Sequence, residues 1–113
     1  MAITVAALFA PTVLTGSAAT IYTVPTSPGT TTLVNGRVRF CNTSNASRAI
    51  TWYAVPASGS AAAGNAQMNA EALAANAHVD VDVPLMGAGA TIQAFADAAS
   101  DVTMSLLAGV LVS

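Results

Sequence analysis

Apolar and polar side chains alternate along several stretches of this 113-residue chain, with the two-residue period of a β-strand that has one buried face. The clearest case is His-Val-Asp-Val-Asp-Val at residues 78–83, which places three valines on one face and a histidine and two aspartates on the other. Asn, Ser, Gly and Pro separate the alternating stretches at intervals of roughly ten residues. This pattern predicts an all-β fold, a single-domain β-sandwich or jelly roll of about seven or eight short strands.

We expect strands at residues 20–25, 37–41, 48–56, 78–84, 90–96 and 101–113. The second and third strands flank the polar segment at 41–47, which predicts that they form a β-hairpin. In the last strand, the even-numbered residues from Val102 to Val112 share one face, while Leu107 and Leu111 make the other face apolar too. The expected core consists of Val38, Phe40, Ile50, Trp52, Val79, Val81, Val83, Ile92, Val102, Met104 and Leu106.

Residues 60–77 do not fit this pattern, because they are rich in Ala, the best helix former. Gly64 and three Asn residues in the same segment oppose a long helix. We expect a loop here, followed by a strand or a single helical turn near residues 67–73.

Charged side chains make up only 7% of the chain, against roughly 25% in an ordinary soluble domain. The chain contains no Lys, and its three Arg, its one Cys and its one Trp all lie within residues 35–56. A net charge of −2 gives little repulsion between copies. Much of the surface is therefore expected to be covered by other copies of the chain or by a partner protein.

The composition argues against two other kinds of partner. The longest uninterrupted apolar runs, at residues 5–11 and 106–112, are far shorter than the ~20 residues of a membrane-spanning helix. Three Arg on a chain of negative net charge do not supply the basic surface that phosphate binding requires. We therefore expect neither a membrane nor nucleic acid as a partner.

Few residues in this chain could carry chemistry. His78 is the only histidine, and His78, Asp80 and Asp82 are spread along about 13 Å of strand at ~3.3 Å per residue, so a solvated polar face explains them better than a metal site. Cys41 cannot form a disulfide within the chain, and no known nucleophile motif surrounds it. The five carboxylates show no pattern typical of acid–base catalysis. We expect no enzyme activity, no cofactor and no metal.

Several motifs together resemble those of small virion proteins of tailed bacteriophages. The motifs are Tyr-Thr-Val-Pro at 22–25, Val-Arg-Phe-Cys-Asn-Thr-Ser at 38–44, Gly-Ala-Gly-Ala-Thr-Ile-Gln-Ala at 87–94 and a terminal Gly-Val strand. The similarity covers residues 20–113, and such proteins are short, Ala- and Val-rich β-sandwich chains with structural roles. The resemblance implies an auxiliary head protein of the decoration or cement kind, made in the bacterial host cytoplasm and placed on the capsid surface of the virion.

A cement protein of this kind binds the major capsid protein and bridges neighbouring capsid subunits, alongside other copies of itself. A tail, connector or fibre subunit of the same virion is the alternative. A free-standing ligand-binding β-domain is a third hypothesis, which the lack of a pocket-forming aromatic cluster disfavours.

Residues 1–19 lie outside the resemblance. We expect residues 1–14 to form an apolar contact arm, and the alternative is that they form an edge strand of the sandwich at 20–113. The arginines have two interpretations, since Arg suits desolvated pairing with a partner's carboxylates but also occurs on a solvated strand face. The candidate interface residues are Ile3, Val5, Leu8, Phe9, Arg37, Arg39 and Arg48.

Overall fold

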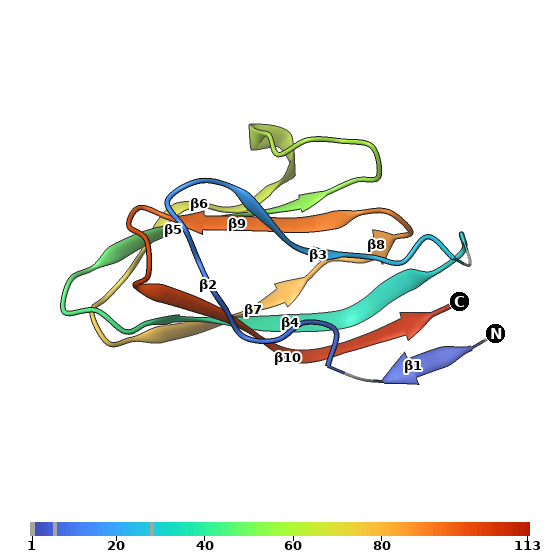
Figure 1. Cartoon of the computed structure of the whole chain (residues 1–113), viewed down its shortest axis with the longest axis horizontal. Helices are drawn as coiled ribbons and strands as arrows, with labels where there is room; N and C mark the ends of the chain where they lie inside the picture. The colour runs from blue at the N-terminus through green and yellow to red at the C-terminus, as the bar shows by residue number, and fades with distance from the viewer. Residues whose placement is uncertain (1, 6, 28) are drawn as a thin grey trace.

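The computed structural model describes residues 2–5, 7–27 and 29–113, and within them ten strands form two antiparallel sheets that pack face to face (Figure 1). One 3₁₀ turn, η1 (Ala63–Asn65), precedes the sixth strand. The strands are β1 (Ile3–Val5), β2 (Thr12–Val13), β3 (Ala19–Thr23), β4 (Thr32–Asn42), β5 (Arg48–Val55), β6 (Ala66–Leu73), β7 (His78–Val83), β8 (Met86–Gly87), β9 (Thr91–Ala96) and β10 (Val102–Val112).

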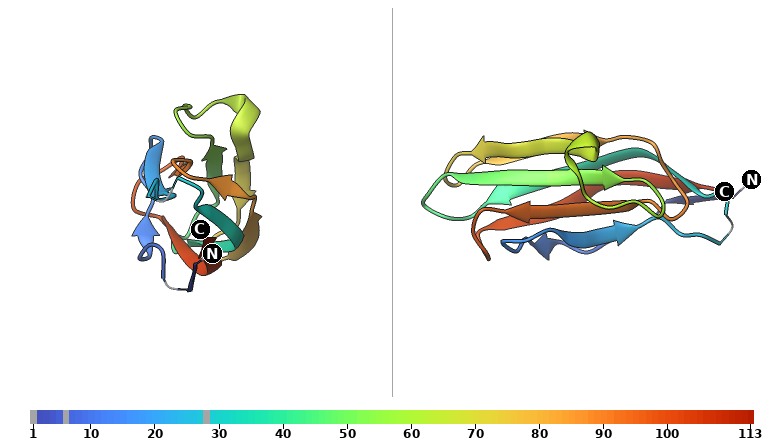
Figure 2. Two further views of the ribbon diagram at one scale, coloured as in Figure 1. Left: turned by 90° about the vertical axis from the view of Figure 1, so that its right-hand side faces the viewer. Right: turned by 90° about the horizontal axis from the view of Figure 1, so that it is seen from above.

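The strand order of the two sheets is that of a jelly roll. One sheet has the order β1-β10-β4-β7, with β2 also pairing β10 and β8 also pairing β4, and the other has the order β3-β9-β5-β6. With β1 and β2 counted as one edge position, and β8 counted with β7 because both pair with β4, the strands occupy eight positions, four in each sheet, as in two Greek keys. The end-on view in Figure 2 shows the strands arranged around one interior. The predicted all-β sandwich is confirmed, and the strand count exceeds the expected one because β1, β2 and β8 have only two or three residues each.

The predicted hairpin between residues 37–41 and 48–56 is wrong, because β4 and β5 lie in opposite sheets. β4 pairs with β10 and β7, whereas β5 pairs with β9 and β6. The inward faces of the two strands therefore meet across the core, where the rings of Phe40 and Trp52 have their centroids 6.5 Å apart. Alternation predicted the strands correctly but not the strands with which each one pairs.

The buried side chain of Asn42 holds the chain at this crossing between sheets. Its Nδ2 donates hydrogen bonds to the carbonyl oxygens of Ala46 at 2.8 Å, Leu73 at 3.1 Å and Ala74 at 3.2 Å. Its Oδ1 accepts from the backbone N–H of Ser44 at 3.0 Å and from the Ser44 hydroxyl at 2.8 Å. One amide thus ties the end of β4 to the arch that leads into β5 and to the end of β6.

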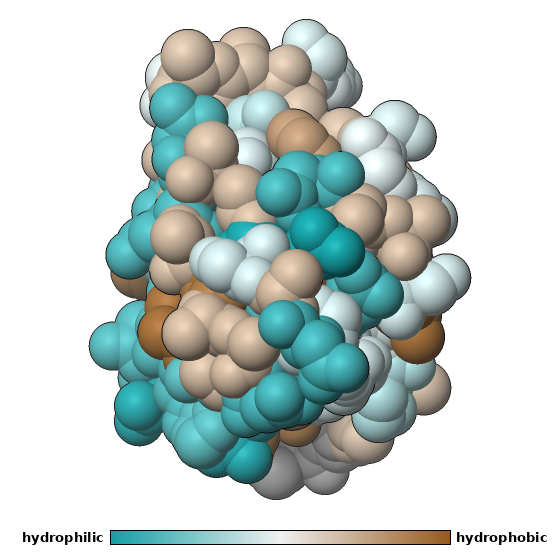
Figure 3. All heavy atoms as spheres, turned by 90° about the vertical axis from the view of Figure 1, so that its left-hand side faces the viewer, coloured by the Kyte–Doolittle hydropathy of each residue, from teal (hydrophilic) through white to brown (hydrophobic). Residues whose placement is uncertain are grey.

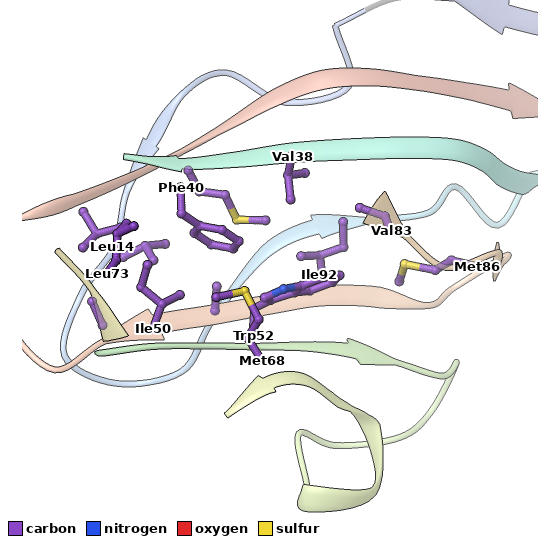
Figure 4. Close-up of a cluster of buried hydrophobic side chains, with 14 of the residues drawn as sticks. Leu14, Val38, Phe40, Ile50, Trp52, Met68, Leu73, Val83, Met86 and Ile92 are labelled. Carbon is purple, nitrogen blue, oxygen red and sulfur yellow. The ribbon is translucent and has the colours of Figure 1, made fainter. Parts of the chain in front are cut away.

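The core between the sheets contains most of the predicted residues (Figure 4). Val79, Val81 and Leu106 are only partly buried and pack against its rim. The chain also buries Leu14 and Met86, which lie outside the predicted strands, so the core reaches further toward both ends of the sandwich. The predicted residues that are buried are Val38, Phe40, Ile50, Trp52, Val83, Ile92, Val102 and Met104.

The face predicted for the second half of β10 is wrong, because the register between β10 and β4 shifts twice. Leu107 is an extra residue in β10 between the pairs that Leu106 and Ala108 make with β4. Beyond the shifts it is Leu111, and not its even-numbered neighbours, that packs against the core. On β4, Asn35 has a φ of 54°. The next residue, Gly36, lies so close to Val83 of β7 that a Cβ at this position would be 2.8 Å from the Val83 Cβ. A β-bulge of this kind cannot be inferred from alternation alone.

The two remaining segments have definite places in the sandwich. Residues 60–77 form a loop, the η1 turn and β6, which confirms the expected loop followed by a strand. Among the described residues before β3, β1 and β2 both pair with β10, and Leu14 is only 1% exposed. No helix in the described part of the chain is long and apolar enough to span a membrane.

The Asn42 contacts generate a stability prediction. Asn42→Ala should lower the free energy of unfolding by about 1–3 kcal/mol, because it removes the side-chain donor to the buried Leu73 carbonyl oxygen and the bonds to Ala46 and Ala74. Asn45→Ala, an exposed change in the same turn, should stay within about 0.5 kcal/mol of the unsubstituted chain. Chemical denaturation followed by the fluorescence of the buried Trp52 measures both values, and equal effects of the two substitutions would contradict the role assigned to Asn42.

Candidate functional site

Cys41 and His78, two residues able to carry chemistry, lie on neighbouring strands of one sheet. Cys41 and His78 lie directly opposite each other in the pairing of β4 with β7, yet no hydrogen bond joins their side chains in the described structure. Within residues 2–5, 7–27 and 29–113, no group of three His, Cys, Asp or Glu side chains could hold a metal ion. The surface of the sandwich is distinguished by its ion pairs and by its exposed apolar residues.

Arg39 and Asp80 form an ion pair with two hydrogen bonds, on the outer face of the sheet that contains β4 and β7. The strand register places them directly opposite each other. Arg39 donates from Nε to Asp80 Oδ1 at 2.7 Å and from its terminal nitrogen Nη2 to Oδ2 at 3.0 Å. These hydrogen bonds hold the pKa of Asp80 below its usual value and raise the pKa of Arg39. Arg39 is therefore already paired within its own chain.

The other two arginines also meet aspartates of the same chain, at very different distances. Arg48 donates from Nε to Asp101 Oδ2 at 2.7 Å, and both side chains are mostly buried. Arg37 lies 4.0 Å from Asp82, with side-chain exposures of 53% and 90%. Of the three arginines, Arg37 is thus the one most accessible to a partner's carboxylate.

An exposed leucine lies beside Arg37, between two hollows of the surface. Leu85, in the turn between β7 and β8, is 73% exposed, the largest value among the exposed large apolar side chains of the described residues. A hollow of about 520 Å³, which Asn35, Arg37 and Asp82 also line, lies on one side of it. A second hollow of about 450 Å³ lies between this turn and the segment that follows β5. We call the residues of the first hollow the Leu85 surface: Asn35, Gly36, Arg37, Asp82, Val83, Leu85 and Ala108.

The N-terminal candidate residues lie on the opposite side of β10. Ile3 is 60% exposed on β1, and the side chain of Val5 lies outside what the structure describes. Leu8 and Phe9 are partly buried against the core, and the Phe9 ring lies 6.0 Å from that of Tyr22. An apolar groove of about 720 Å³ lies between residues 7–11 and residues 106–110 of β10. We call β1 with this groove the β1 edge.

The end of the sandwich opposite the termini differs from both surfaces. Figure 3 views this end, and hydrophilic or weakly hydrophobic residues cover most of it. The ion pair between Arg48 and Asp101 belongs to the turns at this end, so Arg48 does not share a surface with Arg37 and Arg39. The structure therefore does not gather the three arginines into one docking face.

Reasoning from the sequence did not identify Leu85. The available signal was a large apolar residue between Pro84 and Gly87, in a segment that should be a polar turn. The pairing of each arginine with an aspartate also could not be read from the sequence, because it depends on the register between strands.

Comparison of the chain with protein-family models, with curated proteins and with solved structures finds no match.

The pair formed by Arg39 and Asp80 generates a prediction of pH dependence. Because its pKa is lowered in the folded state, Asp80 stabilises the fold fully above the unfolded Asp pKa of about 3.9, and this contribution is lost as the pH falls through the lower folded-state pKa. Asp80→Asn should therefore lower Tm at neutral pH, and the deficit should shrink as the pH falls below about 4. Thermal unfolding followed by circular dichroism at several pH values measures the difference.

Asp97→Asn is the matched control, because it removes the same charge from an exposed carboxylate that forms no ion pair in the described part of the chain. Its Tm should follow that of the unsubstituted chain at each pH. A deficit of Asp80→Asn that does not change with pH would refute the assignment.

Proposed function

We propose that this chain is a structural component of a tailed-bacteriophage virion, and that it acts as a decoration or cement protein on the head. In this function the chain binds the major capsid protein, joins neighbouring capsid subunits and catalyses no reaction. Two things support the proposal: the sequence resemblance over residues 20–113, and the low free charge and exposed apolar side chains of the surface.

The observation that carries the proposal is that most charged side chains of this chain pair with one another. Three ion pairs, between Arg37 and Asp82, Arg39 and Asp80, and Arg48 and Asp101, take up six of the eight charged side chains. Glu71 and Asp97 are the only other charged side chains of Asp, Glu, Lys or Arg type. A surface with so little free charge favours association, which suits a protein that is used in many copies and covered by neighbours.

The Leu85 surface is the best candidate for the contact with the capsid. Protein interfaces commonly combine an apolar anchor with an accessible arginine, and the contact centres on a few such residues. Leu85 supplies the exposed apolar side chain, and Arg37 is loosely enough held by Asp82 to pair with a carboxylate of the partner. The hollows on both sides of Leu85 offer room for partner side chains.

The fold is compatible with this function but does not select it. Jelly rolls occur in viral capsid proteins, and also in lectins and cupins. Because one fold serves many functions, the argument depends on the surface and on the resemblance.

The abundance of the chain in purified virions tests the proposal. If the chain is a cement protein, its copy number on a stained gel should approach that of the major capsid protein, and it should stay with heads separated from tails. A copy number far below that of the capsid protein, or recovery with the tails, would favour the tail, connector or fibre subunit instead.

A substitution at Leu85 tests the docking surface. Leu85→Lys should weaken binding to undecorated heads by at least about tenfold, since the loss of an interface anchor commonly costs more than ~1.4 kcal/mol. Co-sedimentation of the purified chain with heads over a concentration series measures the affinity. Thr20→Lys, at an exposed position of the other sheet, is the control and should bind as the unsubstituted chain does. Equal binding by both variants would remove the Leu85 surface from the proposal.

A further inference from the structure

The two sheets have four outer edges, and an edge strand exposes backbone groups to which another strand can pair. In one sheet the edges are β7 and the N-terminal strands β1 and β2, and in the other they are β3 and β6. Proteins protect such edges with charges, bulges or prolines. The four edges of this sandwich differ in how well they are protected.

Three of the edges carry protective features. β7 contains Asp80 and Asp82, and Pro84 follows it directly. β6 contains Glu71, and its pairing with β5 shifts register next to Ala70, whose φ is 50°. The pairing of β3 with β9 also shifts register, between residues 20 and 22.

β1 carries no charge, bulge or proline, and its short length of three residues is its only protection. It pairs with β10 in a regular register, with Ile3 opposite Val112 and Thr4 opposite Leu111. Its sequence Ile-Thr-Val has no charge and no proline, and residues 2–36 contain no charged side chain. No strand of the described residues pairs with its outer side.

The hydrogen bonds of β1 show which of its backbone groups point outward. The N–H of Ser113 donates to the carbonyl oxygen of Ala2 at 2.9 Å, so the backbone groups of Ala2 face β10. Because these groups alternate sides along an antiparallel strand, those of Thr4 face β10 as well. The N–H and C=O groups of Ile3 and Val5 therefore point away from the sheet, toward a partner strand.

We propose that a second copy of this chain pairs with this edge, β1 against β1 in antiparallel orientation, about a two-fold axis at Thr4. Ile3 of each copy then lies opposite Val5 of the other, and these two pairs exchange backbone hydrogen bonds on either side of the Thr4 pair. The pairing stops at a dimer, because the opposite edge of each sheet, at β7, is protected by its aspartates.

The β1 edge suits a second copy better than an unrelated partner for two reasons. A strand that pairs with its own copy in antiparallel orientation is self-complementary, so one short sequence supplies both sides of the contact. The absence of charged side chains from residues 2–36 also means that two copies meet without like-charge repulsion.

The groove beside β1 adds apolar contact area to these few hydrogen bonds. It lies between residues 7–11 and the part of β10 where the register with β4 shifts, and Leu107, 42% exposed, is on its wall. Burial of exposed apolar side chains such as Ile3 and Leu107 supplies the free energy that a three-residue strand pairing lacks. The pairing does not depend on the proposed virion function.

The mass of the purified full-length chain in solution tests the proposal. Sedimentation equilibrium over a wide concentration range should give a dimer for the unsubstituted chain. Ile3→Pro should raise the dimer dissociation constant at least tenfold, because it removes an outward N–H but spares the hydrogen bonds between β1 and β10. Leu85→Lys changes an exposed leucine away from this edge and should remain dimeric. A monomer at all concentrations, or a dimer that Ile3→Pro leaves intact, would overturn the proposal.

A cross-link tests the register even if Ile3→Pro fails to fold. In the two-fold arrangement the two Thr4 residues form a non-hydrogen-bonded pair with Cα atoms about 4.5 Å apart, within the range that a disulfide spans. Thr4→Cys in a Cys41→Ser background should therefore form a covalent dimer on mild oxidation. Thr20→Cys in the same background, on the protected edge β3, should stay monomeric on a non-reducing gel. The same yield of covalent dimer from both variants would contradict the β1 pairing.

Discussion

The buried amide of Asn42 ties together the strand ends at the point where the chain crosses from one sheet to the other. Its hydrogen bonds to Ala46, Leu73 and Ala74 fix the place where the chain leaves one sheet and enters the other. β4 and β5 follow each other directly in sequence. If they formed a hairpin, they would lie in one sheet, and their inward side chains could not face each other across the core. The crossing instead brings Phe40 and Trp52 together across the core, and later strands complete the two sheets around them.

Much of the fold follows from alternation, because burial on one face imposes a period of two wherever a strand is regular. The valines of β7 and the inward residues of β5 were predicted on this basis, and the core contains or borders all of them. The prediction failed where the period breaks, at Leu107 in β10. It also did not extend the second strand back over residues 32–36, where Asn35 has a positive φ. It failed again for the expected hairpin of β4 with β5, because alternation does not specify which strands pair, and these two lie in opposite sheets.

The candidate surfaces could be predicted only in part. The low charge of the chain predicts that its surface is covered, which stays a prediction. The partners of Arg39 and Arg48 depend on register and on turns that bring distant residues together, so no local pattern reveals them. Arg39 and Arg48 therefore pair with aspartates of their own chain. The exposed Leu85 is the better candidate for a contact with a partner.

The two ends of the chain lie side by side, since Ser113 is hydrogen-bonded to Ala2 at the same end of the sandwich (Figure 1). A force that pulled these ends apart would act first on the outermost hydrogen bond between β1 and β10, and the others would then break one after another. The same bonds resist a force along the strands much better, because all of them bear it together. The molecule is thus mechanically weak to tension at its termini and strong to tension along its sheets, so an attachment through the termini would peel β1 away from β10 before the core was disturbed.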